Sequence, residues 1–263
     1  MSDEVLLSRR DGDLLWLTLN RPERANALSP DLIQRLTEVY GQDWRAQGVR
    51  AILLDGAGRH FSAGADLDHL RSLRDTGLRQ NRSDSAALRG LFEAVLRQET
   101  LTVALVHGAC VAGGCGLATA HDLVVTTADA RFLYSEVRIG FVAALVATFL
   151  PLRLRGRDIR RVLLNPEPLP AEEAMEIGLV DRLVAEGEDP RAAGERMVDA
   201  VLRNASGESI ARTKRLLLEL LGRPLSERLD LAQEANAQAR LTDDCRRGIE
   251  HFLEHKKTPD WRG

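Results

Sequence analysis

The sequence predicts an α/β fold in which a largely parallel sheet is covered by helices. Short apolar runs that end in turn residues alternate with segments whose apolar residues recur at helical spacing. Such alternation is typical of parallel sheets, because each crossover helix packs on a face of the sheet. No strand-like run follows residue 186, so we expect one unit at 1–186 and an all-helical C-terminal region at 187–263.

Strands are expected at 14–20, 50–56, 101–108 and 123–127. The first helix should begin after Ser29, a favourable N-cap that is followed by Pro30 at the first helical position. A second apolar stripe runs from Leu88 to Leu96, and a short helix is expected near 116–122. The polar segment 74–85 carries no apolar stripe and is expected to be a mobile loop or an irregular helix end. Four further helices are expected beyond residue 186.

Composition and charge argue against several classes of partner. The net charge of −3 gives no electrostatic reason to expect nucleic acid. No apolar run approaches the ~20 residues that a membrane-spanning helix needs, and the acidic start lacks the plan of a signal peptide. The three cysteines form no CxxC pair, which indicates reduced thiols. We therefore expect a cytoplasmic protein without a nucleic-acid or membrane partner.

Familiar cofactor motifs are incomplete or missing. Gly56 and Gly58 follow a predicted strand as in a dinucleotide fingerprint, but Phe61 stands where the third glycine is required. The six histidines are scattered, so no metal site is expected, and His121 is interpreted as a helix-end residue. Cys115 has no histidine in its motif to activate it and is interpreted as a small buried residue.

Two stretches of glycine and alanine follow predicted strands: "FSAGADL" at 61–67 and "VAGGCGLA" at 111–118. In a parallel sheet both turns leave the carboxyl ends of strands, where ligands bind. Each precedes a helix-like segment, whose first N–H groups lack internal partners. Two such groups aimed at one point would form an oxyanion hole. The alternative is that both are only tight turns that allow close helix packing.

These stretches, together with "NRPERANALS" (20–29), "ARFLYSEVRIGFV" (130–142) and "AEEAMEIGLVDRLV" (171–184), resemble the crotonase, or enoyl-CoA hydratase/isomerase, superfamily. The resemblance implies a ββα spiral core at 1–186 that binds acyl-CoA. It also implies a helical region at 187–263 that serves oligomerisation and the substrate pocket, with assembly into trimers or dimers of trimers. The substrate would be a thioester whose carbonyl is polarised by the backbone N–H groups of Ala65 and Gly113. Coenzyme A is part of that substrate, and no separate cofactor is implied.

The hydratases of this family use two glutamates, and only one is present. Glu136 matches the glutamate that exchanges the proton at the α-carbon. The water-activating glutamate lies twenty residues earlier in the family, and here that position is Gly116. A surface carboxylate paired with Arg138 is the alternative interpretation of Glu136. The family's Pro-Gly-x-Gly-Gly segment is also replaced, by the apolar residues 142–146.

The resemblance also implies contacts to coenzyme A, and for the basic residues among them a solvated surface is the alternative. A neighbouring subunit would add an aromatic residue and a lysine from its C-terminal helix, but the family's lysine position is His255 here, so Lys256 or Lys257 would be the substitute. The implied contacts are Arg24, Ala25, Ala63, Ala65, Asp66, Leu67, Phe252 and Lys256.

The sequence thus predicts an enoyl-CoA hydratase that acts through Glu136 and an oxyanion hole. An isomerase that shifts a double bond is the alternative, since one carboxylate is enough to move a proton between two carbons. A non-catalytic acyl-CoA binder or an RNA binder of the same fold are further alternatives. The retained Glu136 argues against the first of these, and the net charge of −3 against the second.

Overall fold

The larger sheet of the computed structural model, which describes residues 4–262, has six strands in the order β1-β2-β3-β4-β6-β9. β1 and β2 pair antiparallel, and every later pair in this sheet is parallel. The four predicted strands are confirmed to within two residues. The six strands are β1 (Leu6–Asp11), β2 (Leu14–Leu19), β3 (Ala51–Gly56), β4 (Leu101–Val106), β6 (Leu123–Thr126) and β9 (Arg182–Leu183).

Strands β2, β3, β4 and β6 are buried on both faces of this sheet. Successive side chains of a strand point to opposite faces, so each of these strands contributes to two cores. In β2, Leu15 and Leu17 enter one hydrophobic core, while Leu14 and Trp16 enter a second core on the other face. This double burial explains why the predicted strands read as continuous apolar runs rather than as alternating ones.

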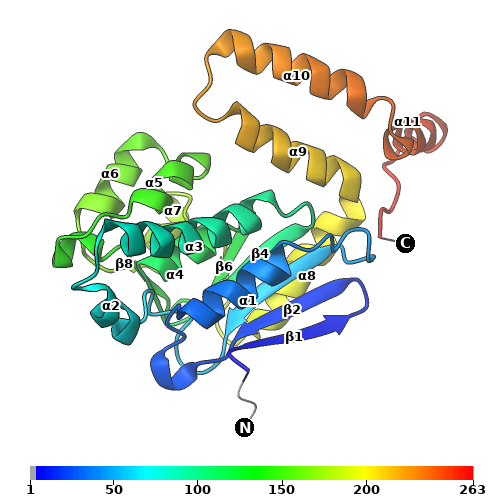
Figure 1. Cartoon of the computed structure of the whole chain (residues 1–263). Helices are drawn as coiled ribbons and strands as arrows, with labels where there is room; N and C mark the ends of the chain where they lie inside the picture. The colour runs from blue at the N-terminus through cyan, green and yellow to red at the C-terminus, as the bar shows by residue number, and fades with distance from the viewer. Residues whose placement is uncertain (1–3, 263) are drawn as a thin grey trace.

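The first core is covered by α1 (Pro30–Tyr40), α3 (Leu78–Arg97) and α4 (Gly113–Thr119), and the second by α8 (Pro190–Asn204) (Figure 1). Ser29 caps α1 as predicted, since its hydroxyl oxygen accepts a hydrogen bond from the N–H of Leu32 at 3.3 Å. α2 (Leu67–Leu73), which lies between α1 and α3 in the chain, has no buried residue.

The prediction of a loop or irregular end at 74–85 is wrong from residue 78 onward. Residues 78–85 form the first two turns of α3, and all of them except Asp84 are exposed. A helical segment that buries no side chain needs no apolar stripe, so its periodicity is invisible in the sequence.

A smaller sheet carries the chain from β4 to the glycine turn at 111–118. It has the order β5-β7-β8, and its strands are too short for a periodic pattern, so they were not predicted. Short helices lie before and after this smaller sheet in the chain. The remaining elements of this part are β5 (Ala109–Val111), β7 (Arg131–Leu133), β8 (Leu169–Pro170), η1 (Pro22–Arg24), η2 (Glu136–Ile139), η3 (Leu150–Leu152), α5 (Ala144–Phe149), α6 (Gly156–Leu164) and α7 (Ala171–Glu176).

The four helices expected beyond residue 186 are confirmed: α8 is followed by α9 (Gly207–Leu220), α10 (Leu225–Ala239) and α11 (Asp243–His255). Figure 1 shows α10 and α11 extending away from the sheet. Neither helix has a buried residue. Their exposed large apolar side chains are Leu225, Leu229, Ile249, Phe252 and Leu253.

Residues 258–262 return from α11 to the sheet and form what we call the C-terminal clasp. The guanidinium of Arg262 contacts the carboxylate of Asp13 at 2.7 Å and that of Asp199 at 2.8 Å. Arg203 contacts Asp260 at 2.7 Å. The clasp therefore ties the end of the projecting helices to the β1–β2 turn and to α8.

Within residues 4–262, none of the helices combines the length and the apolar character that crossing a membrane requires. The same residues contain no group of three histidine, cysteine, aspartate or glutamate side chains that could hold a metal ion.

Candidate active site

The first glycine turn, at 61–67, is held in place by the segment 20–29 that precedes α1. The side chain of Asn26 is fully buried and donates to the carbonyl oxygens of Ala57, at 2.9 Å, and His60, at 2.8 Å. Ala63 N donates to the carbonyl of Ala25 at 2.8 Å. Ala25 and Asn26 adopt positive φ angles of 47° and 53°, which are uncommon for residues other than glycine. The surrounding hydrogen bonds therefore enforce a specific path for this turn.

The second glycine turn, at 111–118, lies directly against the first. Val111 N donates to the carbonyl oxygen of Ser62 at 2.9 Å. A β-carbon added to Gly64, whose φ is +82°, would lie 2.5 Å from the carbonyl oxygen of Val111 and 3.3 Å from the amide nitrogen of Gly113. Only glycine permits this approach, and the approach brings the backbones of the two turns together.

The N–H groups of Ala65 and Gly113 donate to no acceptor among the described residues. The parallel bridge between Leu28 and Ala65 uses the carbonyl of Gly64, at 2.7 Å from Leu28 N, and not the N–H of Ala65. Gly113 is the first residue of α4, where amide groups have no partner within the helix. Two unengaged donors therefore lie in turns that touch each other.

Glu136 begins η2, three residues after the end of β7. The Ala112 N–H donates to the carbonyl of Leu133 at 2.7 Å, and this bond ties the end of β7 to the start of α4. Glu136 is only 8% exposed, and its buried Oε2 has no hydrogen-bond partner among the described residues. Burial raises the pKa of this carboxyl above its usual value, because a poorly hydrated site disfavours the charged form.

The alternative that Glu136 is a surface residue paired with Arg138 is wrong. The Arg138 side chain instead donates to the carbonyl oxygen of Pro166. Both side chains belong to η2, but they have different surroundings. Among the described residues, the Glu136 carboxylate forms no ion pair with Arg138.

Gly116, where the resemblance implies that the family carries its other glutamate, has no space for a side chain. A β-carbon there would lie 2.7 Å from Phe92 Cζ and 2.7 Å from Val146 Cγ2. Both distances are far below the ~3.5–4.0 Å at which carbon atoms pack. The volume that the family's glutamate would occupy is therefore filled by hydrocarbon.

Most of the residues that the resemblance assigns to coenzyme A lie around the first glycine turn. Asp66 caps α2 and contacts Arg21 at 2.9 Å. Burial by itself raises the pKa of Asp66, but hydrogen bonds from Arg21 and from the N–H groups of the first turn of α2 lower it below the usual value. Arg24 contacts Asp68 at 3.2 Å near the surface, and Leu67 is 70% exposed.

Phe252 and Lys256 do not join this group within one chain. Phe252 lies in α11 and Lys256 caps its end. Figure 1 shows α11 on the opposite side of the chain from α2.

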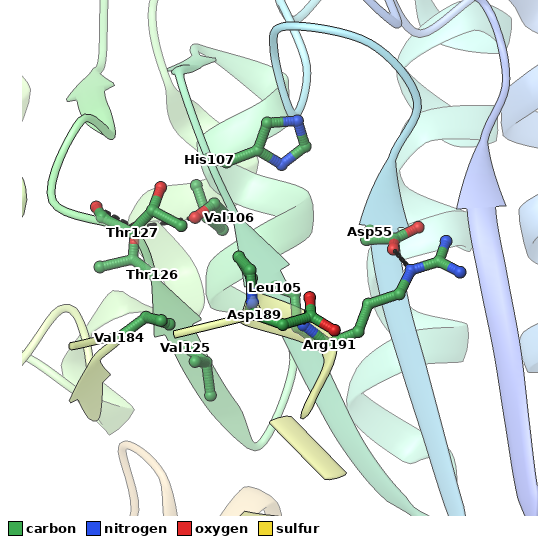
Figure 2. A pocket seen from close by; sticks show the side chains of 11 residues that line it. Asp55, Leu105, Val106, His107, Val125, Thr126, Thr127, Val184, Asp189 and Arg191 are labelled. Atoms are coloured by element: carbon green, nitrogen blue, oxygen red, sulfur yellow. Dashed lines mark hydrogen bonds and ion pairs between the residues drawn. The ribbon is translucent and has the colours of Figure 1, made fainter. Parts of the chain in front are cut away.

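A separate cavity of about 260 Å³ lies at the carboxyl ends of β3, β4 and β6, beside the start of α8 (Figure 2). Arg191 reaches across to Asp55, and its Nε lies 2.6 Å from the carboxylate. The same guanidinium stacks on Trp16, with 5.0 Å from its central carbon to the ring centroid. None of the predicted site residues lines this cavity.

Sequence reasoning identified the two turns and Glu136, but it missed Phe92 as part of the site. Phe92 belongs to the apolar stripe of α3, and a stripe indicates only that a residue is buried. His121 is a fully packed residue whose Nε2 lies 2.6 Å from the Tyr40 hydroxyl, and burial lowers its pKa to about 3. Its interpretation as a structural residue agrees with this position.

The chain is similar to known proteins over nearly its whole length. The family model for enoyl-CoA hydratase/isomerase matches residues 9–263. A Thermus thermophilus protein with a provisional enoyl-CoA hydratase name is 40% identical over 245 residues, 93% of this chain and 96% of that protein. The cyclohexa-1,5-dienecarbonyl-CoA hydratase of Thauera aromatica is 30% identical over 253 residues, 96% of this chain and 94% of that protein. Among solved structures, AtuE of Pseudomonas aeruginosa has a TM-score of 0.90 at 32% identity, covering 99% of this chain and 100% of that one.

Proposed function

Because the chain belongs to the enoyl-CoA hydratase/isomerase family, we propose that it adds water reversibly to a 2-enoyl-CoA thioester. The observation that carries this proposal is the buried, unpartnered carboxyl oxygen of Glu136, connected through β7 to the touching glycine turns. The hydratase names of the relatives from Thermus thermophilus and Thauera aromatica support hydration.

In this proposal the thioester carbonyl oxygen accepts hydrogen bonds from the N–H groups of Ala65 and Gly113. Charge develops on that oxygen as an enolate forms, and fixed backbone dipoles stabilise it without reorganising. Removal of one such donor typically raises the barrier by ~3–4 kcal/mol. The small residues of both turns let the thioester reach the backbone.

Glu136 would handle both proton movements of the hydration. Its carboxylate removes a proton from a water molecule while the water oxygen forms a bond to C3, and the electron pair of the double bond moves into the enolate. The resulting carboxylic acid returns the proton to C2, and the carboxylate is regenerated. A raised pKa suits this role, since efficient proton transfer needs a group that titrates near the working pH.

Coenzyme A would lie along the first glycine turn, against Arg24, Ala25, Ala63, Asp66 and Leu67. Phe252 and Lys256 would contact the coenzyme A of a neighbouring subunit. The exposed apolar side chains of α10 and α11 support assembly into trimers or dimers of trimers. Light scattering coupled to size-exclusion chromatography tests this, and a monomer would contradict it.

Double-bond isomerisation is the second candidate, and the filled space beside Gly116 favours it. An isomerase needs one carboxylate to remove a proton from one carbon and to deliver it to another. Hydration needs in addition a positioned water, which Glu136 alone must hold here.

The test is to incubate the purified protein with crotonyl-CoA and to follow the absorbance of the conjugated thioester. Loss of the absorbance, with formation of 3-hydroxybutyryl-CoA, supports hydration. No loss, together with conversion of a 3-enoyl-CoA into the conjugated isomer, replaces hydration by isomerisation. Tight acyl-CoA binding without either reaction would leave only a binding function.

A further inference from the structure

We infer that Phe92 and Val146 determine the acid–base chemistry of this site, because they fill the space that a catalytic side chain at position 116 would need. This inference rests on the proposed function for its chemical part. The packing part, that no side chain fits at position 116, depends only on the observed distances. The chemical part, that this restricts the acid–base chemistry, has a test of its own. We call these two side chains the 116 wall.

The 116 wall is a fixed part of the core and not a flexible surface. Phe92 and Val146 are each 3% exposed. The ring of Phe92 packs edge-on against Phe149, with 5.5 Å between the ring centroids. A side chain at position 116 can therefore enter only by displacing groups that are held from behind, which costs the energy of overpacking.

Under the proposed function, the wall also borders the substrate. Residue 116 follows Gly113 by three positions in α4, and residues at this spacing lie on the same face of a helix. If the thioester oxygen is held at the N–H of Gly113, the acyl carbons beyond the carbonyl pass close to position 116. There they meet the hydrocarbon of Phe92 and Val146 instead of a carboxylate.

The three atoms nearest to a β-carbon at position 116 all belong to Phe92 and Val146, so a carboxylate there would leave the backbone among apolar groups. A charged group that is buried among apolar side chains without a partner is strongly disfavoured. The wall therefore excludes a second catalytic carboxyl group at position 116, which leaves the proton transfers of the proposed reaction to Glu136. Placing a glutamate at position 116 without removing the wall therefore cannot create a two-carboxylate site.

The packing part is tested with Gly116→Ala in two backgrounds. In the wild-type background we expect the added methyl to lower the melting temperature by several degrees. In a Phe92→Leu/Val146→Ala background the clashing atoms are gone, and the same change should raise the melting temperature, because alanine is the better helix former. Stabilisation by Gly116→Ala in the wild-type background would refute the inference that Phe92 and Val146 leave no space for a side chain at position 116.

The chemical part is tested with Gly116→Glu, and Gly116→Gln serves as the matched neutral control. In the Phe92→Leu/Val146→Ala background we expect the glutamate variant to hydrate crotonyl-CoA at least tenfold faster than the glutamine variant. In the wild-type background we expect no gain. Equal rates of the two variants in the opened background, or a tenfold gain from Gly116→Glu alone, would overturn the chemical part. Failure of the proposed function would look different. The wild-type protein would then be inactive on every enoyl thioester, while Gly116→Ala would still lower the melting temperature in the wild-type background and raise it in the Phe92→Leu/Val146→Ala background.

Discussion

Replacement of Gly64 by alanine should be among the most damaging single-methyl changes in this chain. Two costs add at this position. The φ of +82° is one that side chains with a β-carbon rarely adopt, and holding such a residue there costs ~1–2 kcal/mol. The new β-carbon would also lie 2.5 Å from the carbonyl oxygen of Val111, and overpacking of this kind costs ~1–3 kcal/mol.

The sum is about 2–5 kcal/mol of unfolding free energy, out of the ~5–15 kcal/mol that is typical of folded proteins. The protein should therefore remain folded but melt lower by several degrees, since ~1 kcal/mol shifts the midpoint by ~2–4 °C at about this size. The contact also separates the Ala65 and Gly113 N–H groups, so the rate on an enoyl-CoA should fall by ~10²–10³-fold, as for the loss of one oxyanion donor.

Gly187→Ala is the matched control for this experiment. Gly187 has a φ of +78°, but a β-carbon there would meet nothing within 4 Å. The control therefore carries the conformational cost alone, and urea unfolding of both variants isolates the steric cost as their difference. Equal destabilisation of the two variants, or full activity of Gly64→Ala, would refute the close contact between the glycine turns.

Three further changes probe the carboxyl groups and the clasp. Glu136→Gln should lower the rate by ~10²–10⁴-fold. Burial raises the pKa of Glu136, so the folded state disfavours the charged form of this carboxyl. The Glu136→Gln variant should therefore melt at a higher temperature than the wild type at pH 8, and the difference should disappear as the pH falls to 4.5. A lower melting temperature of the variant at pH 8 would contradict this reasoning. Asp66→Asn should cost about 1–3 kcal/mol at pH 7 through its lost ion pair with Arg21. Because the pKa of Asp66 is lowered in the folded state, this cost should persist down to about pH 3.8 and shrink as the pH falls further, which urea unfolding at several pH values measures. Arg262→Ala should lower the free energy of unfolding by only about 1 kcal/mol, because its partners Asp13 and Asp199 are partly exposed. It should nevertheless accelerate proteolysis between α9 and α11. An unchanged rate of digestion would show that the clasp does not restrain these helices.

The sequence allowed four of the six strands of the larger sheet to be predicted, because these four are buried on both faces. β1, whose residues are half-buried or exposed, carries no such apolar run and was not predicted. A run such as 14–20 contains consecutive large apolar residues, and turn residues mark its end. The same reasoning failed for residues 78–85, which are helical but exposed. Hydrophobic periodicity reports burial, so it is silent where a helix lies on the surface.

The candidate site was predictable only in part. The glycine turns and Glu136 carry recognisable residue types at fixed spacing, and these were identified. The contact of Phe92 with position 116 joins α3 to α4, and the contact of Val146 joins α5 to the same point. Contacts between residues that are distant in the chain depend on how the helices pack, and one sequence does not record them.

The C-terminal clasp constrains the order in which parts of the protein fold during synthesis. Arg262 lies 249 residues after its partner Asp13, so this contact cannot form until residue 262 has left the ribosome. The strands and the helices that cover them can pair earlier, because the earlier part of a chain generally folds first during synthesis. The projecting helices α10 and α11 are therefore anchored after the sheet has formed, so their exposed apolar side chains take up their orientation only once the core has been translated.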